Sequence, residues 1–67
     1  MISVSINGAA RDFPQAISVA GLIQAMGLVG KRIALERNGE IVPRSQFEQQ
    51  MLADGDKLEI VVAVGGG

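Results

Sequence analysis

The chain has 67 residues, of which 48 % are hydrophobic, and its two aromatic residues are Phe13 and Phe47. It contains no cysteine and no histidine, so a small single domain must be stabilised by an aliphatic core instead of by disulfides or zinc. Six basic and seven acidic residues give a formal net charge of −1, which argues against binding to nucleic acid or to an anionic membrane through a basic face.

The absence of cysteine is compatible with a reducing compartment. The first residues, MISVSINGAARD, have neither a basic region nor a long apolar stretch, so no signal peptide is predicted within them. No segment approaches the ~20 apolar residues that a membrane span needs. We therefore expect a cytoplasmic protein with no membrane partner.

The N-terminal segment ISVSING alternates between apolar and polar residues, which predicts a half-buried strand. Asn7 and Gly8 follow, and this pair favours a type I′ hairpin turn because both residues accept a positive φ. AARDF is then the returning strand, which ends before Pro14. The alternative is an irregular N-terminal arm.

The segment ISVAGLIQAMGL predicts an amphipathic helix. Ser18 is expected to cap its N-terminus, and Ile17 and Leu22 have the spacing of a hydrophobic staple. Gly21 stands where a capping box would have Glu, and Gly27 suits the left-handed residue that follows a helix. The apolar stripe, which we expect to face the core, consists of Val19, Leu22, Ile23 and Met26.

The rest of the chain predicts two more strands, a helical turn and a final strand. Residues 31–44 contain a second hairpin signal at Asn38 and Gly39. RSQFEQQML is expected to hold one helical turn capped by Ser45, and Asp54 to Asp56 to form a turn before the strand KLEIVVAV. The order predicts an α+β fold in which a mixed sheet of four to five strands packs on one α-helix. We expect the first and last strands to be neighbours, since both are rich in Ile and Val.

The final strand has two different faces. Leu58, Ile60 and Val62 share one face, which we expect to lie against the helix. Val61 and Ala63 then form an apolar spot on the open face, and exposed apolar patches often mark contact surfaces. The alternative is an isolated exposed valine without a binding role.

No catalytic arrangement is recognisable in the sequence. Hydrolysis and acyl transfer need a nucleophile beside a base, and the chain has no histidine or cysteine. GLVGKR lacks the first glycine of a phosphate loop and has Arg32 where Ser or Thr must bind magnesium. Asp54 and Asp56 are too few for a calcium site. The sequence therefore predicts no catalytic residue, no metal site and no cofactor bound by the chain itself.

The sequence ends in AVGGG. At an average glycine usage of about 7 %, three consecutive glycines at a given position have a chance of roughly 3 in 10,000, although this chain is itself rich in glycine. Three glycines can enter a channel too narrow for other residues. They would present the α-carboxylate of Gly67, which becomes electrophilic once it is converted to an acyl-adenylate. The alternative is a disordered or truncated terminus.

Taken together, these segments resemble the ubiquitin-like β-grasp sulfur carriers of the MoaD/ThiS family, and within it the carriers of thiamine biosynthesis. The resemblance covers nearly the whole chain and rests on INGAARDF, SVAGLIQAMGL, IALERNGEIVPRSQ, LADGDKLEIV and AVGGG in this order. It implies a β-grasp domain at residues 1–64 and a flexible glycine tail at residues 65–67.

The resemblance also implies a mechanism. An E1-like adenylyltransferase of the ThiF type would use ATP and Mg²⁺ to form an acyl-adenylate on Gly67. Sulfur from a donor such as a cysteine desulfurase would convert it to a thiocarboxylate, which a thiazole synthase of the ThiG type would consume. Gly65 and Gly66 would thread into the partner's active site, with Gly65 an addition to the family's terminal Gly-Gly. The expected partner-binding residues are Val61, Ala63 and Val64.

Two alternatives remain open at this stage. One is a carrier for another pathway, such as the small subunit of molybdopterin synthase, whose relatives usually end in a Pro-containing strand before Ser-Gly-Gly. VVAVGGG departs from that pattern. The other is a non-catalytic ubiquitin-like interaction module or a protein modifier joined to lysines through Gly67.

Overall fold

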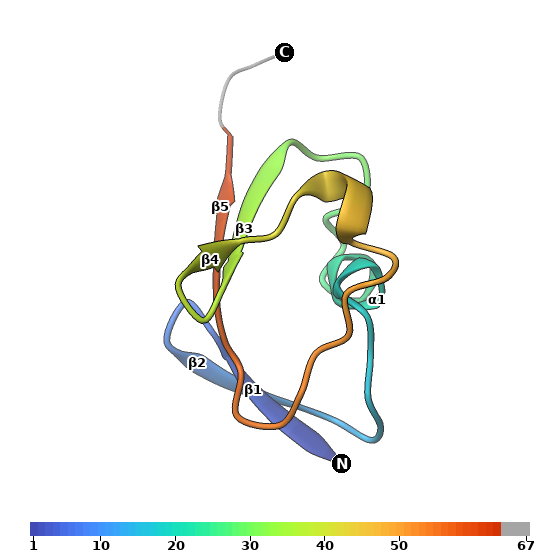
Figure 1. The fold of residues 1–67 in the computed structure, drawn as a ribbon, viewed down its shortest axis with the longest axis vertical. Coiled ribbons are helices and arrows are strands. Elements are labelled where there is room, and N and C mark those ends of the chain that lie inside the picture. The colour runs from blue at the N-terminus through green and yellow to red at the C-terminus, as the bar shows by residue number, and fades with distance from the viewer. Residues whose placement is uncertain (64–67) are drawn as a thin grey trace.

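A computed structural model describes residues 1–63 of the chain. Val64 and the three glycines, and with them the predicted boundary between residues 64 and 65, lie outside the described residues. Figure 1 shows the elements in chain order. They are β1 (Ile2–Ile6), β2 (Ala9–Phe13), α1 (Val19–Ala25), β3 (Ile33–Arg37), β4 (Glu40–Ile41), the 3₁₀ helix η1 (Arg44–Gln46) and β5 (Lys57–Val62).

The described strands form one five-stranded sheet in the order β2-β1-β5-β3-β4. β1 and β5 are parallel, whereas β1–β2, β3–β4 and β3–β5 are antiparallel. The predicted α+β architecture is confirmed, with five strands, one α-helix and a short helical turn. The prediction that the first and last strands are neighbours is also confirmed, and β5 has a central position.

Both predicted hairpin turns are present. Asn7 and Gly8 have φ values of 50° and 87°, and Asn38 and Gly39 have 52° and 86°. Each pair forms a two-residue loop, because Ile6 pairs directly with Ala9 and Arg37 with Glu40. Positive φ at both central residues is the requirement of a type I′ turn, which explains the Asn-Gly sequence at both sites.

The helix begins and ends as the sequence predicts. Ser18 Oγ accepts a hydrogen bond of 3.0 Å from the backbone N–H of Gly21, which satisfies one of the free donors of the first turn. Gly27 has φ +73°, and Leu28 N donates to Ile23 O at 3.0 Å. This is the Schellman ending, in which a left-handed residue lets the chain turn away from the helix.

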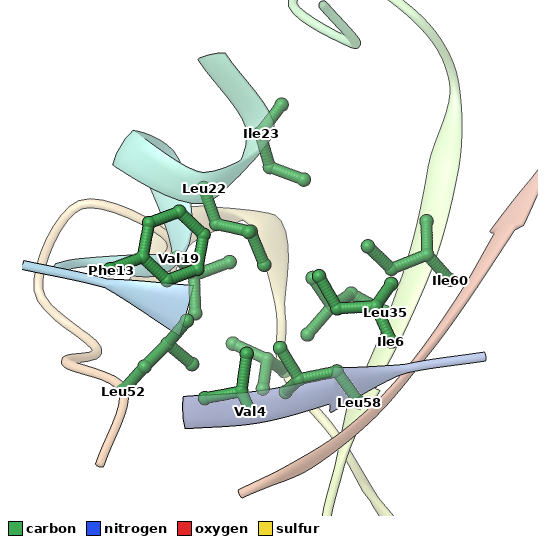
Figure 2. Close-up of a cluster of buried hydrophobic side chains, with 11 residues drawn as sticks. Val4, Ile6, Phe13, Val19, Leu22, Ile23, Leu35, Leu52, Leu58 and Ile60 are labelled. Atoms are coloured by element: carbon green, nitrogen blue, oxygen red, sulfur yellow. The ribbon is translucent and has the colours of Figure 1, made fainter. Parts of the chain in front are cut away.

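The core lies between α1 and one face of the sheet (Figure 2). Leu22 and Val19 of the helix are fully enclosed, as are Leu35 of β3 and Leu58 of β5. Burial of such side chains stabilises each by about 1.5–3 kcal/mol relative to exposure. Met26 is partly buried against this core, in agreement with its predicted place in the apolar stripe.

Ser45 does not cap the helical turn, contrary to the prediction. It lies inside η1, which is preceded by Pro43 and has no side-chain cap. Gln46 N donates to Pro43 O at 2.9 Å, and Phe47 N donates to Arg44 O at 3.1 Å. Because the proline carbonyl accepts the first bond of the turn, the cap position falls two residues before Ser45.

Within residues 1–63, no helix has the length and apolar character needed to cross a membrane.

Candidate functional site

The strand that leads to the glycines is held in the sheet up to the last described residue. β5 ends at Val62, but Ala63 N still donates to Arg32 O at 2.8 Å, so pairing with β3 continues one residue further. Figure 1 shows that β5 runs toward the end of the molecule opposite the N-terminus. The backbone of Val62 and Ala63 is therefore held in place by β3.

The structure places two of the predicted partner-binding residues on the open surface. Val61 is 66 % exposed, and Ala63 is also exposed. Leu58 and Ile60 face the core as predicted, whereas Val62 is 39 % exposed at the end of the strand. The other predicted site residues, Val64, Gly65, Gly66 and Gly67, lie outside the described residues.

The face of the sheet that points away from α1 is here called the outer face. Near the end of β5 it carries both apolar and acidic side chains. β3 and β5 pair Ala34 with Val61 and Glu36 with Glu59, and side chains that stand directly opposite share a face. Ile41 of β4 pairs with Glu36 and is 70 % exposed. The apolar spot predicted at Val61 therefore extends to Ala34 and borders on two carboxylates.

Asp56 anchors the beginning of β5. Its side chain is buried, with 6 % exposure, and accepts hydrogen bonds from Arg37 Nε at 2.7 Å, Asn38 Nδ2 at 3.1 Å and Ala53 N at 2.8 Å. Burial alone would raise the pKa of Asp56, but these hydrogen bonds and the charge of Arg37 outweigh it and hold the pKa below its ordinary value. Asp56 thus ties the β3–β4 turn to β5.

The sequence correctly predicts a turn at Asp54 to Asp56, and Gly55 has φ +89°. It does not predict that Asp56 is an inward-facing anchor, because Arg37 and Asp56 are 19 residues apart in the chain. Asp54 instead accepts a hydrogen bond of 2.7 Å from Ser3 N at the surface. Both aspartates are therefore engaged in the fold.

The helix side of the molecule carries a shallow groove of about 250 Å³ between α1, the following loop and η1. Ile33 lines this groove and also pairs with Val62 of β5. Val29 is 68 % exposed there, and Glu48 is also exposed. This surface lies on the other side of the sheet from Val61 and Glu59, which makes its residues suitable controls.

The described residues contain no group of three or more Asp, Glu, His or Cys that could hold a metal ion. The outer face can make apolar contacts through Val61, Ala34 and Ile41 and ionic contacts through its two carboxylates. The outer face is thus an exposed surface of mixed apolar and acidic character beside the end of β5.

Comparison with known proteins gives a consistent result. The model of the ThiS family matches residues 4–67. A thiazole synthase of Paramagnetospirillum magneticum is 47 % identical over 62 residues, which cover 92 % of this chain but only 19 % of that protein. The sulfur carrier protein ThiS of Bacillus subtilis is 36 % identical over 50 residues, which cover 75 % of this chain and 76 % of that protein.

The fold is also similar to that of a solved structure. The crystal structure of the thiamine biosynthesis protein ThiS from Geobacter metallireducens matches with a TM-score of 0.83 and 26 % sequence identity, covering 98 % of this chain and 100 % of that one. A TM-score of this size over the full length means that the strand order and the helix position coincide.

Proposed function

Because the chain belongs to the ThiS family, the sulfur carriers of thiamine biosynthesis, we propose that it carries sulfur as a thiocarboxylate on Gly67. The observation that supports this most directly is the course of β5. The strand pairs with β3 up to Val62 and with β1 at Lys57 and Leu58, and in the sequence only Ala63 and Val64 separate it from GGG. A protein of this design presents a chain end, and its partners carry out the reactions.

In the first step, an adenylyltransferase of the E1-like ThiF type uses ATP and Mg²⁺ to convert the carboxylate of Gly67 to an acyl-adenylate. A carboxylate is a poor electrophile, and the adenylate supplies AMP as a leaving group. The persulfide made by a cysteine desulfurase displaces AMP and forms an acyl disulfide, and a thiol reductant then cleaves the S–S bond and leaves the thiocarboxylate on Gly67. Gly65 and Gly66 have no Cβ, so they fit a narrow channel that leads to the reacting carbonyl.

In the last step, a thiazole synthase of the ThiG type takes the sulfur. The match to a bacterial thiazole synthase supports this partner, since a segment similar to this chain forms part of that longer protein. When carrier and synthase belong to one chain, their effective concentration is high. The separate chain would need a surface that docks on this partner instead.

The experiment that tests this function is intact mass measurement after incubation with an extract of the source cells, ATP and cysteine. We expect a mass gain equal to the replacement of one oxygen by sulfur. The gain should disappear when ATP is omitted or Gly67 is deleted.

An unchanged mass, in an extract shown to thiolate a known ThiS protein, would contradict the proposal. Species of much higher mass, joined through Gly67 to other proteins, would indicate a protein modifier instead.

A further inference from the structure

Two glutamates stand directly opposite each other on the outer face of the sheet. Glu36 of β3 pairs with Glu59 of β5, and both are exposed. Hydrogen bonds from Asn38 N to Lys57 O and from Ala63 N to Arg32 O fix the register on either side. Because these bonds alternate along an antiparallel pair, Glu36 and Glu59 form a hydrogen-bonded pair, with Cα atoms about 5.5 Å apart.

This pairing is unfavourable for the isolated domain, since like charges directly opposite in a sheet repel each other. No cation within the described part of the chain forms an ion pair with either carboxylate. Arg37, the neighbour of Glu36 in β3, is engaged by Asp56 on the other side of the sheet. Lys57 lies two residues before Glu59 on the same face but forms no ion pair with it.

Apolar side chains border the two carboxylates on the side toward the tail and on β4. Ala34 and Val61 form the next row toward the tail, and Ile41 lies beside Glu36 on β4. Val61 and Ile41 are 66 % and 70 % exposed. A charged centre with apolar neighbours is suited to receive a complementary cation, because docking shields the charges from water and strengthens their attraction.

We propose that Glu36 and Glu59 together bind an arginine side chain of the protein that adenylates Gly67, while Val61, Ala34 and Ile41 pack around it. This inference rests on the proposed function and adds the chemistry of the partner surface. Arginine fits better than lysine, because its planar guanidinium can donate to two carboxylates at once. Binding removes the repulsion that the free domain carries between β3 and β5.

The test uses the full chain with the ThiF-type adenylyltransferase of the same organism, in an ATP–pyrophosphate exchange assay at several salt concentrations. The double variant Glu36→Gln with Glu59→Gln should raise the KM for the carrier by about tenfold or more, with kcat little changed. Its KM should also depend less on salt than that of the original chain. Its stability in urea should be equal or higher, because the repulsion is gone.

The controls are Asp12→Asn, Glu48→Gln and their combination, which has the same change of charge as the double variant. Asp12→Asn alters the outer face at the distant strand β2, and Glu48→Gln alters the groove on the helix side. All three should leave KM unchanged. A general effect of net charge would raise KM in the controls as well, and this would overturn the inference.

Failure of the inference can be told apart from failure of the proposed function. If the original chain supports exchange and forms the thiocarboxylate, but the double variant has the same KM within twofold, the acidic pair is not the binding element. If the original chain supports neither exchange nor thiocarboxylate formation, the proposed function itself fails, and this inference fails with it.

Discussion

Asn7 and Ile60 exchange two hydrogen bonds although they are 53 residues apart. Ile60 N donates to Asn7 Oδ1 at 2.7 Å, and Asn7 Nδ2 donates to Ile60 O at 3.0 Å. The described pairing of β1 with β5 ends at Ile6 and Leu58, so the carboxamide takes the place of a further peptide group. The side chain of a hairpin turn thereby holds the strand that leads to the tail.

We predict that Asn7→Gly lowers the free energy of unfolding by about 1–3 kcal/mol, because the N–H and C=O of the buried Ile60 lose their partners. Glycine keeps the positive φ of the turn, so the change removes the carboxamide without straining the backbone. Asn7→Ala should lose about 1–2 kcal/mol more, since alanine disfavours the left-handed conformation. Urea unfolding measures both values.

Hydrogen exchange gives a local check on the same bond. The amide of Ile60 should exchange faster in Asn7→Gly than in the original chain, beyond the change expected from global stability. Asn7→Asp keeps an acceptor for Ile60 N and should show a smaller effect. Equal stability and equal protection of Ile60 in Asn7→Gly would show that the carboxamide does not hold β5.

The lowered pKa of Asp56 predicts the pH dependence of stability. The ordinary pKa of the group is 3.8, and the folded value lies below it. A carboxyl with a depressed pKa stabilises the fold above the unfolded pKa, and this contribution is lost as the pH falls through the folded pKa. We therefore expect the free energy of unfolding to decrease on acidification below about pH 4.

The variant Asp56→Asn should remove most of this dependence and lower stability at neutral pH by about 2–3 kcal/mol, because Arg37 loses a charged acceptor. Urea unfolding between about pH 2.5 and pH 7 measures both effects. Asp12→Asn is the control and should keep the acid-sensitive part of the curve. An Asp56→Asn protein with the same slope in acid would assign that slope to another carboxyl.

Local patterns explain why so much of the fold could be predicted. The Asn-Gly pairs predict both hairpins, and Ser18 and Gly27 predict the two ends of the helix, because each signal acts within a few residues. That β1 and β5 are adjacent in the sheet is predicted by their shared richness in Ile and Val. The exposure of Val61 on the outer face follows from the alternation of β5.

The features that sequence reasoning missed depend on contacts across the sheet. These contacts depend on how strands far apart in the sequence are aligned, which no single segment determines. They are the hydrogen bonds between Asn7 and Ile60 and between Arg37 and Asp56, and the pairing of Glu36 with Glu59. The residue type of Ser45 predicts a cap, but Pro43 occupies the cap position of the turn. The tail residues Val64 to Gly67 remain predictions.

Gly21 shows a different limit of sequence reasoning. An alanine in place of glycine usually stabilises a helix by about 1 kcal/mol. At Gly21, however, an added Cβ would lie 2.7 Å from Ile17 Cγ1 and 3.2 Å from Ile17 Cδ1. Since Ile17 packs against the core, it has little freedom to move, and we expect Gly21→Ala to lower stability by about 1 kcal/mol.

Thermal or urea unfolding tests this prediction. In a background that carries Ile17→Ala, the close contact is absent, so Gly21→Ala should become stabilising through helix propensity. If Gly21→Ala stabilises the original chain as well, the side chain of Ile17 moves away from the new Cβ at a negligible cost in free energy. The close contact would then have no effect on stability.

The last prediction concerns Val61, which we propose as a docking residue. Val61→Lys places a charge in the apolar row beside Glu36 and Glu59, where it removes packing area and competes for the two carboxylates. We expect the adenylation of Gly67 to require about tenfold more carrier, as for loss of a central interface residue. The fold should remain intact, because Val61 is 66 % exposed.

Val29→Lys is a matched control, since Val29 is 68 % exposed but lies in the groove on the helix side. Measured binding to the adenylyltransferase should weaken only for Val61→Lys. If both variants bind the adenylyltransferase as tightly as the original chain, this partner contacts the tail without using the outer face. The match to a thiazole synthase would then direct the search to a surface that contacts the synthase.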